Sequence, residues 1–392
     1  MMSKYIYMDN AATTPIKREV LEAMMPYFTD KYGNPSSIYS IGGQSRNAIE
    51  RAREKVSKVF NAKPQEIFFT SCGSESDNWA IKGIAYANRK RGNHIITSKI
   101  EHHAVLHTCQ YLEKQGFRVT YLDVDEYGFI NLDQLKESIR DDTILISIMF
   151  ANNEIGTIQP IAEIGKIAKE KGIYFHTDAV QAIGNVKIDV NELNIDLLSL
   201  SAHKFYGPKG IGALYIRQGV KIDPLISGGA QERNRRAGTE NVPYIVGLGK
   251  AIELAYENID EHNEKLTKLR KRLIKGIFDN IDYVRLNGDD EKRLPGNANF
   301  CFRFIEGESI LLSLDMEGIA GSSGSACTSG SLDPSHVLLA IGLPHEIAHG
   351  SLRLTLGDFN TEEDVDYVIE KLTEIVARLR AMSPLYDERR ER

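Results

Sequence analysis

Short apolar runs alternate with amphipathic segments over roughly residues 60–220, and this alternation constrains the fold most. Seven runs share the pattern: "EIFFT" (66–70), "HIITS" (94–98), "FRVTYLDV" (117–124), "TILISIMF" (143–150), "GIYFHTD" (172–178), "IDLLSLSAH" (195–203) and "GIGALYI" (210–216). Strands separated by helix-length segments are typical of βαβ units. The sequence therefore predicts an α/β fold with a mainly parallel seven-stranded sheet covered by helices, and ligands beyond the carboxyl ends of its strands.

A different pattern follows a long charged amphipathic stretch at about 244–280. The segments "DYVRLNG", "GNANFCFRF" and "SLRLTLG" are expected to be strands, with helices near 307–317, 334–341 and 361–381. We predict a large domain over 16–256, and a smaller α+β domain made of 1–15 and 257–392.

Composition excludes several classes of protein. The net charge of −6 argues against a nucleic-acid surface. No apolar run is long enough for a membrane span or a secretory signal, so a cytoplasmic protein is expected. The cysteines Cys72, Cys109, Cys301 and Cys327 are far apart and form no CxxC pair, which argues against disulfides and a structural metal site.

Polar residues at two predicted strand ends are candidates for chemistry. Lys204 in "SAHKFYGPKGIG" is either a surface lysine or an amine that binds an aldehyde cofactor. Asp178 in "FHTDAVQA" is either a helix N-cap or the partner of a pyridinium nitrogen, and Gln181 lies three residues further on.

Three further strand ends carry suitable groups. Gly73 and Ser74 begin a predicted helix, whose N-terminus is a ready anion site. His102 and His103 are adjacent and should point in opposite directions, so only one is expected to face a site. Asn153 could bond a ring hydroxyl or a carboxylate, or could simply form a turn.

One thiol, Cys327, lies in "GSSGSACTSGS", where no neighbour can fill a core. The segment is either a linker with an incidental cysteine or a flexible loop whose thiol has to move. Because the other candidates suggest a cofactor site, we expect a moving thiol and weak order across about 321–332.

Taken together, these motifs resemble the class V, fold type I pyridoxal phosphate (PLP) enzymes, and among them the NifS/IscS cysteine desulfurases. The resemblance covers essentially the whole chain, through "YMDNAATTP", "YGNPSS", "TSCGSESDN", "IEHHAV", "ANNEIG", "HTDAVQ", "SAHKFYGPKGIG", "RRAGTENV", "SSGSACTSG" and "SLRLTLG". It implies that PLP is the cofactor and that L-cysteine is converted to alanine, with its sulfur left on Cys327 as a persulfide.

The resemblance also implies roles for single residues. Lys204 would bind the aldehyde of PLP, Asp178 its ring nitrogen and Gln181 its ring hydroxyl, while His102 would stack on the ring and transfer protons. The phosphate-binding positions are Gly73, Ser74, Ser201, His203 and, from the other subunit of a homodimer, Thr239. Asn153, also beside the cofactor, would hold the substrate carboxylate with Arg353, whose planar fork suits bidentate binding.

The resemblance also bears on the partner protein and on the subtype of the enzyme. A scaffold protein of the NifU/IscU type is the expected sulfur acceptor in iron–sulfur cluster assembly. The chain stops at "LYDERRER", without the longer tail of IscS-type members, which favours a NifS-like subtype. The alternatives are a selenocysteine lyase or another class V lyase, a class V aminotransferase that needs no loop thiol, and a sulfur carrier without cofactor chemistry.

Overall fold

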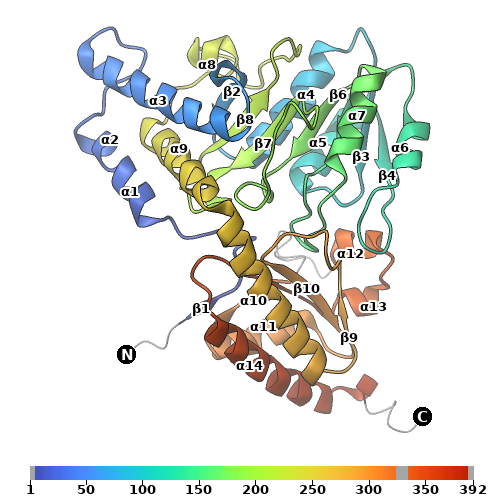
Figure 1. Cartoon of the computed structure of the whole chain (residues 1–392). Coiled ribbons are helices and arrows are strands. Elements are labelled where there is room, and N and C mark those ends of the chain that lie inside the picture. Colours follow the sequence, from blue (N-terminus) through green and yellow to red (C-terminus); the bar gives the residue numbers. More distant parts are fainter. Residues whose placement is uncertain (1–4, 324–333, 387–392) are drawn as a thin grey trace.

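A seven-stranded sheet lies at the centre of the computed structural model, which describes residues 5–323 and 334–386 (Figure 1). The strand order is β2-β8-β7-β6-β5-β3-β4. The strands are β2 (Ile67–Thr70), β3 (His94–Ser98), β4 (Arg118–Leu122), β5 (Thr143–Ser147), β6 (Tyr174–Asp178), β7 (Leu197–Ser201) and β8 (Gly212–Ile216). Only β8 runs antiparallel to its neighbours. The predicted strands and the mainly parallel sheet are confirmed.

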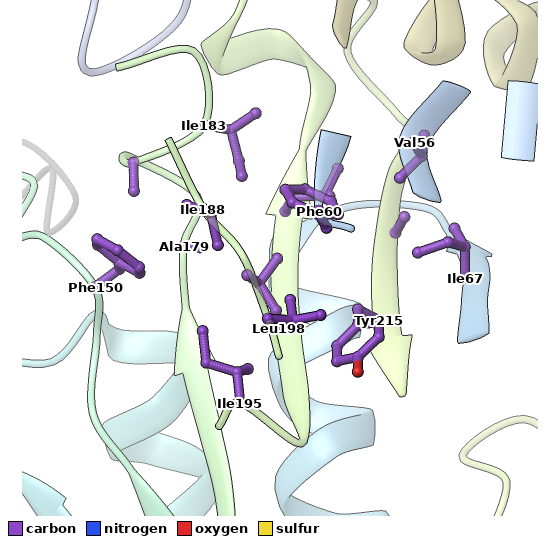
Figure 2. Close-up of a cluster of buried hydrophobic side chains, with 14 of the residues drawn as sticks. Val56, Phe60, Ile67, Phe150, Ala179, Ile183, Ile188, Ile195, Leu198 and Tyr215 are labelled. Atoms are coloured by element: carbon purple, nitrogen blue, oxygen red, sulfur yellow. The ribbon is translucent and has the colours of Figure 1, made fainter. Parts of the chain in front are cut away.

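Helices cover both faces of this sheet because neighbouring strand residues point to opposite sides. Ile95 belongs to the apolar cluster beneath α4 (Gly73–Ala87) and α5 (His103–Lys114), and Ile96 to the cluster beneath α3, α7 and α9. These last helices are α3 (Ser40–Val59), α7 (Ile161–Lys171) and α9 (Val242–Glu257). Figure 2 shows part of the second cluster, where Val56 and Phe60 lie on the side of the sheet to which Leu198 and Tyr215 point.

The C-terminal part has its own antiparallel sheet, in the order β12-β10-β9. Its elements are β9 (Val284–Leu286), β10 (Asn297–Phe302), β12 (Ser351–Thr355), α10 (Ile259–Asn280), α11 (Gly307–Met316), α12 (His336–Ala340), α13 (His345–Ala348) and α14 (Glu362–Ala381). The expected strands and helices are therefore present. The amphipathic stretch over 244–280 divides into α9 and α10 at Asn258, whose backbone is not helical (φ −131°, ψ 39°).

The N-terminal residues join the C-terminal part. β1 (Ile6–Tyr7) pairs in parallel with β11 (Ile319–Ala320), and Ile6 and Met8 pack in the core formed by α10, β10, β12 and α14. The division at 15/16 and 256/257 stays a prediction. No helix within the described ranges is long and apolar enough to cross a membrane.

The remaining helices are short and connect the main layers. They are α1 (Arg18–Met24), α2 (Pro26–Thr29), α6 (Leu132–Ser138), α8 (Gln231–Asn234) and two 3-10 turns, Pro64–Glu66 and Ala202–Lys204. The second of these turns follows β7 directly and carries Lys204 to the carboxyl end of the sheet.

Candidate active site

The carboxyl ends of the parallel strands meet at a cavity of about 280 Å³. Ten of the predicted site residues line it: Gly73, Ser74, His102, Asn153, Asp178, Gln181, Ser201, His203, Lys204 and Arg353. A neighbouring cavity of about 440 Å³ shares Ala11, Gln181 and Lys204 with it. The fold thus brings together predicted site residues that are up to 280 positions apart in sequence, from Gly73 to Arg353.

Lys204 reaches across to the N-terminal segment. Its Nζ donates to the carbonyl oxygens of Ala11 (2.5 Å) and Ala12 (2.8 Å), and Nε2 of Gln181 donates to the same Ala11 oxygen (3.0 Å). Sequence reasoning missed Ala11, although "DNAATT" directly after a strand is the kind of small, polar segment that approaches a site closely. The lysine is therefore held at the sheet edge by two backbone acceptors.

Asp178 is the last residue of β6 and is buried. Its Oδ1 accepts from the backbone N–H of Val180 (2.9 Å) in a local turn. In the described chain no α-helix begins there, so the helix N-cap interpretation is wrong. Burial raises the pKa of this carboxyl to about 6, while the Val180 N–H and the charge of Lys204 lower it. A cation that arrives beside Asp178 would favour its ionised form.

His102 caps α5, and its Nδ1 accepts from the backbone N–H of Ala104 (3.1 Å). Burial, and then the charge of Lys204, lowers the pKa of His102 to about 4, so the imidazole is neutral near pH 7. With Nδ1 accepting, its hydrogen is on Nε2. His103 instead stacks on His107, with ring centroids 4.9 Å apart, and does not line the cavity. Of these two histidines, His102 lines the cavity and His103 does not.

The helix α4 presents its N-terminus to the cavity at Gly73, directly after Cys72. The first backbone N–H groups of a helix have no partner within it and attract anions. A Cβ at Gly73 would lie 2.8 Å from Cγ2 of Val180, so Val180 would have to shift to make room for it. Ser201 and His203 line the same cavity from the end of β7. This cradle suits a group with several anionic oxygens.

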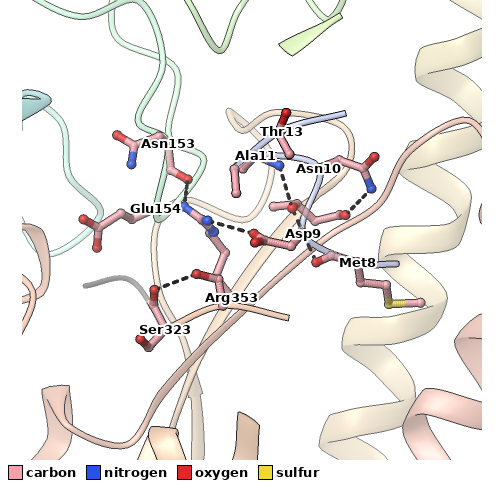
Figure 3. A network of polar contacts seen from close by, with 12 residues as sticks. Met8, Asp9, Asn10, Ala11, Thr13, Asn153, Glu154, Ser323 and Arg353 are labelled. Atoms are coloured by element: carbon pink, nitrogen blue, oxygen red, sulfur yellow. Dashed lines mark hydrogen bonds and ion pairs between the residues drawn. The ribbon is translucent and has the colours of Figure 1, made fainter. Parts of the chain in front are cut away.

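Arg353 lines the cavity from β12 and is only 4% exposed. Its Nη1 donates to the backbone oxygen of Asn153 (2.9 Å), and its Nη2 to Oδ1 of Asp9 (2.9 Å) (Figure 3). Sequence reasoning did not single out Asp9, whose place beside Arg353 depends on the pairing of two segments more than 340 residues apart.

Two buried carboxyls near the site were also missed. Asp77 lines the cavity, and burial together with the charge of Asp178 raises the pKa of Asp77 well above its usual range. Glu101 is fully buried; its Oε1 accepts from the hydroxyl of Ser98 (2.6 Å) and the N–H of Met149 (3.0 Å). Burial raises the pKa of Glu101 to about 8, so this side chain is largely protonated at neutral pH.

Two predicted site residues are not in this cavity. Thr239 is exposed and is not among the lining residues. Cys327 lies outside the described residues, as does most of the segment expected to be weakly ordered. The described chain leads toward it as far as Ser323, and Ser322 pairs with Arg353 through two backbone hydrogen bonds of 2.6 and 3.0 Å. The segment that carries Cys327 therefore starts beside Arg353.

Comparison with known proteins decides the family. The aminotransferase class-V model matches residues 6–368, which is most of the chain. The chain belongs to the aminotransferase class-V family. Among class-V relatives, "Cysteine desulfurase IscS" of Clostridium botulinum (strain Hall) is 67% identical over 389 residues, which cover 99% of this chain and 98% of that one.

Solved structures agree with this class-V assignment. A protein named "NIFS-LIKE PROTEIN" superposes with a TM-score of 0.91 at 43% identity, covering 96% of this chain and all of the other. The structure titled "SspA in complex with cysteine" has a TM-score of 0.81 at 42% identity, covering 91% of this chain and all of the other. The expected α/β fold of fold type I enzymes is confirmed.

Class-V enzymes use PLP, and the residues of the cavity fit this cofactor. A buried carboxyl suits a protonated ring nitrogen, an amine suits the aldehyde, and a helix N-terminus without room for a Cβ suits the phosphate. The chemistry needed to bind the cofactor is thus present on this chain.

Proposed function

We propose that this class-V enzyme is a cysteine desulfurase, which takes sulfur from L-cysteine and releases L-alanine. The observation that carries the proposal is one cavity that combines Lys204 and Asp178 with Arg353, beside the start of a segment that contains a thiol. Relatives named cysteine desulfurase match nearly the full chain at up to 67% identity, which supports the same reaction. The relatives include proteins named IscS and NifS-like, so the NifS-like subtype stays a prediction.

When bound, PLP supplies an aldehyde for amino groups and a ring that accepts electrons from the substrate α-carbon. Lys204 would hold the aldehyde and, when not bound to it, would move the α-proton of the substrate through its Nζ. Asp178 would keep the proton on the ring nitrogen. Gln181 would bind the ring hydroxyl, and His102 would lie beside the ring with its Nε2–H available as a donor.

The two ends of the cavity bind anions. Gly73, Ser74, Ser201 and His203 hold the phosphate, at the α4 N-terminus. On the other side Arg353 binds the substrate carboxylate, and Asn153, whose backbone oxygen already orients the guanidinium, contributes its side chain. The amino acid is thereby placed with its side chain free to meet a nucleophile.

Cys327 is the proposed sulfur acceptor. Its thiolate forms an S–S bond to the substrate sulfur as the substrate Cβ–S bond breaks; Cβ keeps the electron pair and takes a proton, which leads to alanine. Cys327 is the fourth residue after Ser323, and at 3.3–3.6 Å per residue this stretch of chain spans at most about 14 Å. The covalent tether therefore permits contact with the cavity beside Arg353.

The test is to incubate the PLP-bound protein with L-cysteine and to measure alanine and protein-bound persulfide. Equal amounts of both in a single turnover are expected. Pyruvate with an aminated cofactor would instead identify an aminotransferase, and a marked preference for selenocysteine would identify a selenocysteine lyase.

The enzyme is further proposed to be a homodimer in which Thr239 completes the phosphate site of the other subunit. Thr239 is exposed on its own chain, as this role requires. Apolar side chains are also exposed between residues 21 and 39, among them Tyr32 (70%) and Ile38 (101%). Such a surface is typical of a protein interface.

Subunit mixing tests the role of Thr239. Lys204→Ala and Thr239→Ala proteins are each expected to be impaired. A mixed dimer has one site with both native residues, so activity should return after subunit exchange. No recovery, despite exchange shown by differently tagged subunits, would mean that Thr239 acts within its own chain. A NifU/IscU-type scaffold as acceptor and a cytoplasmic location stay predictions.

A further inference from the structure

Asp9 is the charged group that holds Arg353. The ion pair joins Oδ1 of Asp9 to Nη2 of Arg353 at 2.9 Å, and the two side chains are 19% and 5% exposed. Figure 3 shows Asp9 directed toward the guanidinium from the N-terminal segment, and Asn153 on the other side. The orientation of the guanidinium is thus set by one carboxylate and one backbone oxygen.

Other contacts do not replace this one. The Nε of Arg353 is buried and has no hydrogen-bond partner among the described residues. Glu154 lies close enough for Arg353 to lower its pKa, but its Oε2 accepts from the hydroxyl of Ser335 (2.5 Å). Without Asp9, the described residues would leave only the oxygen of Asn153 to orient the guanidinium.

The position of Asp9 follows from backbone pairing. The N–H of Thr355 donates to the Met8 oxygen (2.7 Å), and the N–H of Asn10 to the Thr355 oxygen (3.3 Å). Arg353 and Thr355 are two apart on β12 and therefore point to the same face. This register places Asp9 beside Arg353 in the same segment whose Ala11 oxygen accepts from Lys204.

We propose that Asp9 is a positioning residue that directs the Arg353 guanidinium and thereby sets the affinity of the site for the carboxylate of an amino-acid substrate. The inference rests on the proposed function, in which Arg353 binds that carboxylate. A guanidinium binds a carboxylate bidentately only when its planar fork is aligned with it. The side chain has many rotamers, so a partner that selects one of them lowers the ordering cost of binding.

The experiment compares two thiols with the PLP-bound enzyme. 3-Mercaptopropionate has the carboxylate of cysteine and no amine, whereas 2-aminoethanethiol has the amine and no carboxylate. The Kd of 3-mercaptopropionate is measured by calorimetry. The Kd of 2-aminoethanethiol is measured from the change in PLP absorbance. Asp9→Ala is expected to raise the Kd of 3-mercaptopropionate roughly tenfold, as for a lost hydrogen bond to a charged group. The Kd of 2-aminoethanethiol should stay within about twofold of the wild-type value.

Two variants complete the design. Asp9→Asn keeps an oxygen acceptor for Nη2 and should recover most of the lost affinity. Asp366→Ala, on α14, removes an exposed ion pair with Arg272 of α10 and should change neither Kd. Kinetics with L-cysteine should show a higher KM for Asp9→Ala, with kcat within about threefold of wild type.

Several results would overturn the inference. In one, Asp9→Ala weakens the binding of both thiols by the same factor, as a general loss of structure would. In another, Asp9→Asn binds 3-mercaptopropionate as weakly as Asp9→Ala does. Wild-type enzyme that fails to bind 3-mercaptopropionate would also overturn it, because no carboxylate site would exist. Alanine formation from L-cysteine by the wild type is measured separately and decides the proposed function by itself.

Discussion

Replacing Gly73 by alanine should weaken PLP binding because Val180 would have to shift to make room for the added methyl group. The added Cβ would lie 2.8 Å from Cγ2 of Val180 and 3.5 Å from Cβ of Ser201. The first distance is well inside the 3.5–4.0 Å at which carbon atoms attract each other. Overpacking of this kind costs about 1–3 kcal/mol. When that strain falls on the bound state, the Kd for PLP rises roughly 5- to 160-fold.

A double-mutant cycle separates this clash from other effects of the substitution. Val180→Ala removes the atom that the new methyl would meet, so Gly73→Ala should cost much less in that background. Gly43 in α3 is the matched control, because a Cβ there meets nothing within 4 Å. Gly43→Ala should leave PLP affinity unchanged and stabilise the helix by up to about 1 kcal/mol.

The assay is a titration of the apoenzyme with PLP, followed by absorbance, together with thermal unfolding of each variant. Wild-type affinity in Gly73→Ala would refute the reasoning, since the cradle would then accept a Cβ. An equal loss with and without Val180 would also refute it, because the clash would not be the cause.

Three further predictions concern the thiol, the lysine and a buried acid. Cys327→Ala should keep the absorbance of bound PLP and lose protein-bound persulfide, measured by labelling; stoichiometric persulfide on this variant would contradict its role. Lys204→Ala should lose both the wild-type PLP spectrum and alanine formation. Glu101→Gln should stabilise the fold more at pH 8 than at pH 5, by about 1 kcal/mol or more in denaturant titrations. The pKa of Glu101 is raised from about 4.5 to about 8 in the folded protein, so the stability that protonated Glu101 contributes is lost as pH rises through this range. Equal gains in stability at both pH values would contradict this.

The order and type of the main elements could be predicted because they depend on local patterns. Period-2 and continuous apolar runs gave all seven strands of the large sheet. The short elements β1, β11 and α13 were not predicted, because two to four residues are too few to show a period. The break at Asn258 also escaped, since both flanking helices continue the amphipathic pattern.

The sequence by itself determined which residues stand at strand ends, and therefore that Lys204, Asp178 and His102 share one edge of a parallel sheet. Only the tertiary structure decided how these groups are held. The carbonyl of Ala11 accepts from Lys204, 193 residues away, and Asp9 pairs with Arg353, 344 residues away, because the backbone of the N-terminal segment pairs with β12. Burial, which also depends on the complete fold, decides that His102 is neutral and Glu101 protonated. Local periodicity carries no information on such long-range contacts, because they form only when the N-terminal segment pairs with β12 in the folded chain.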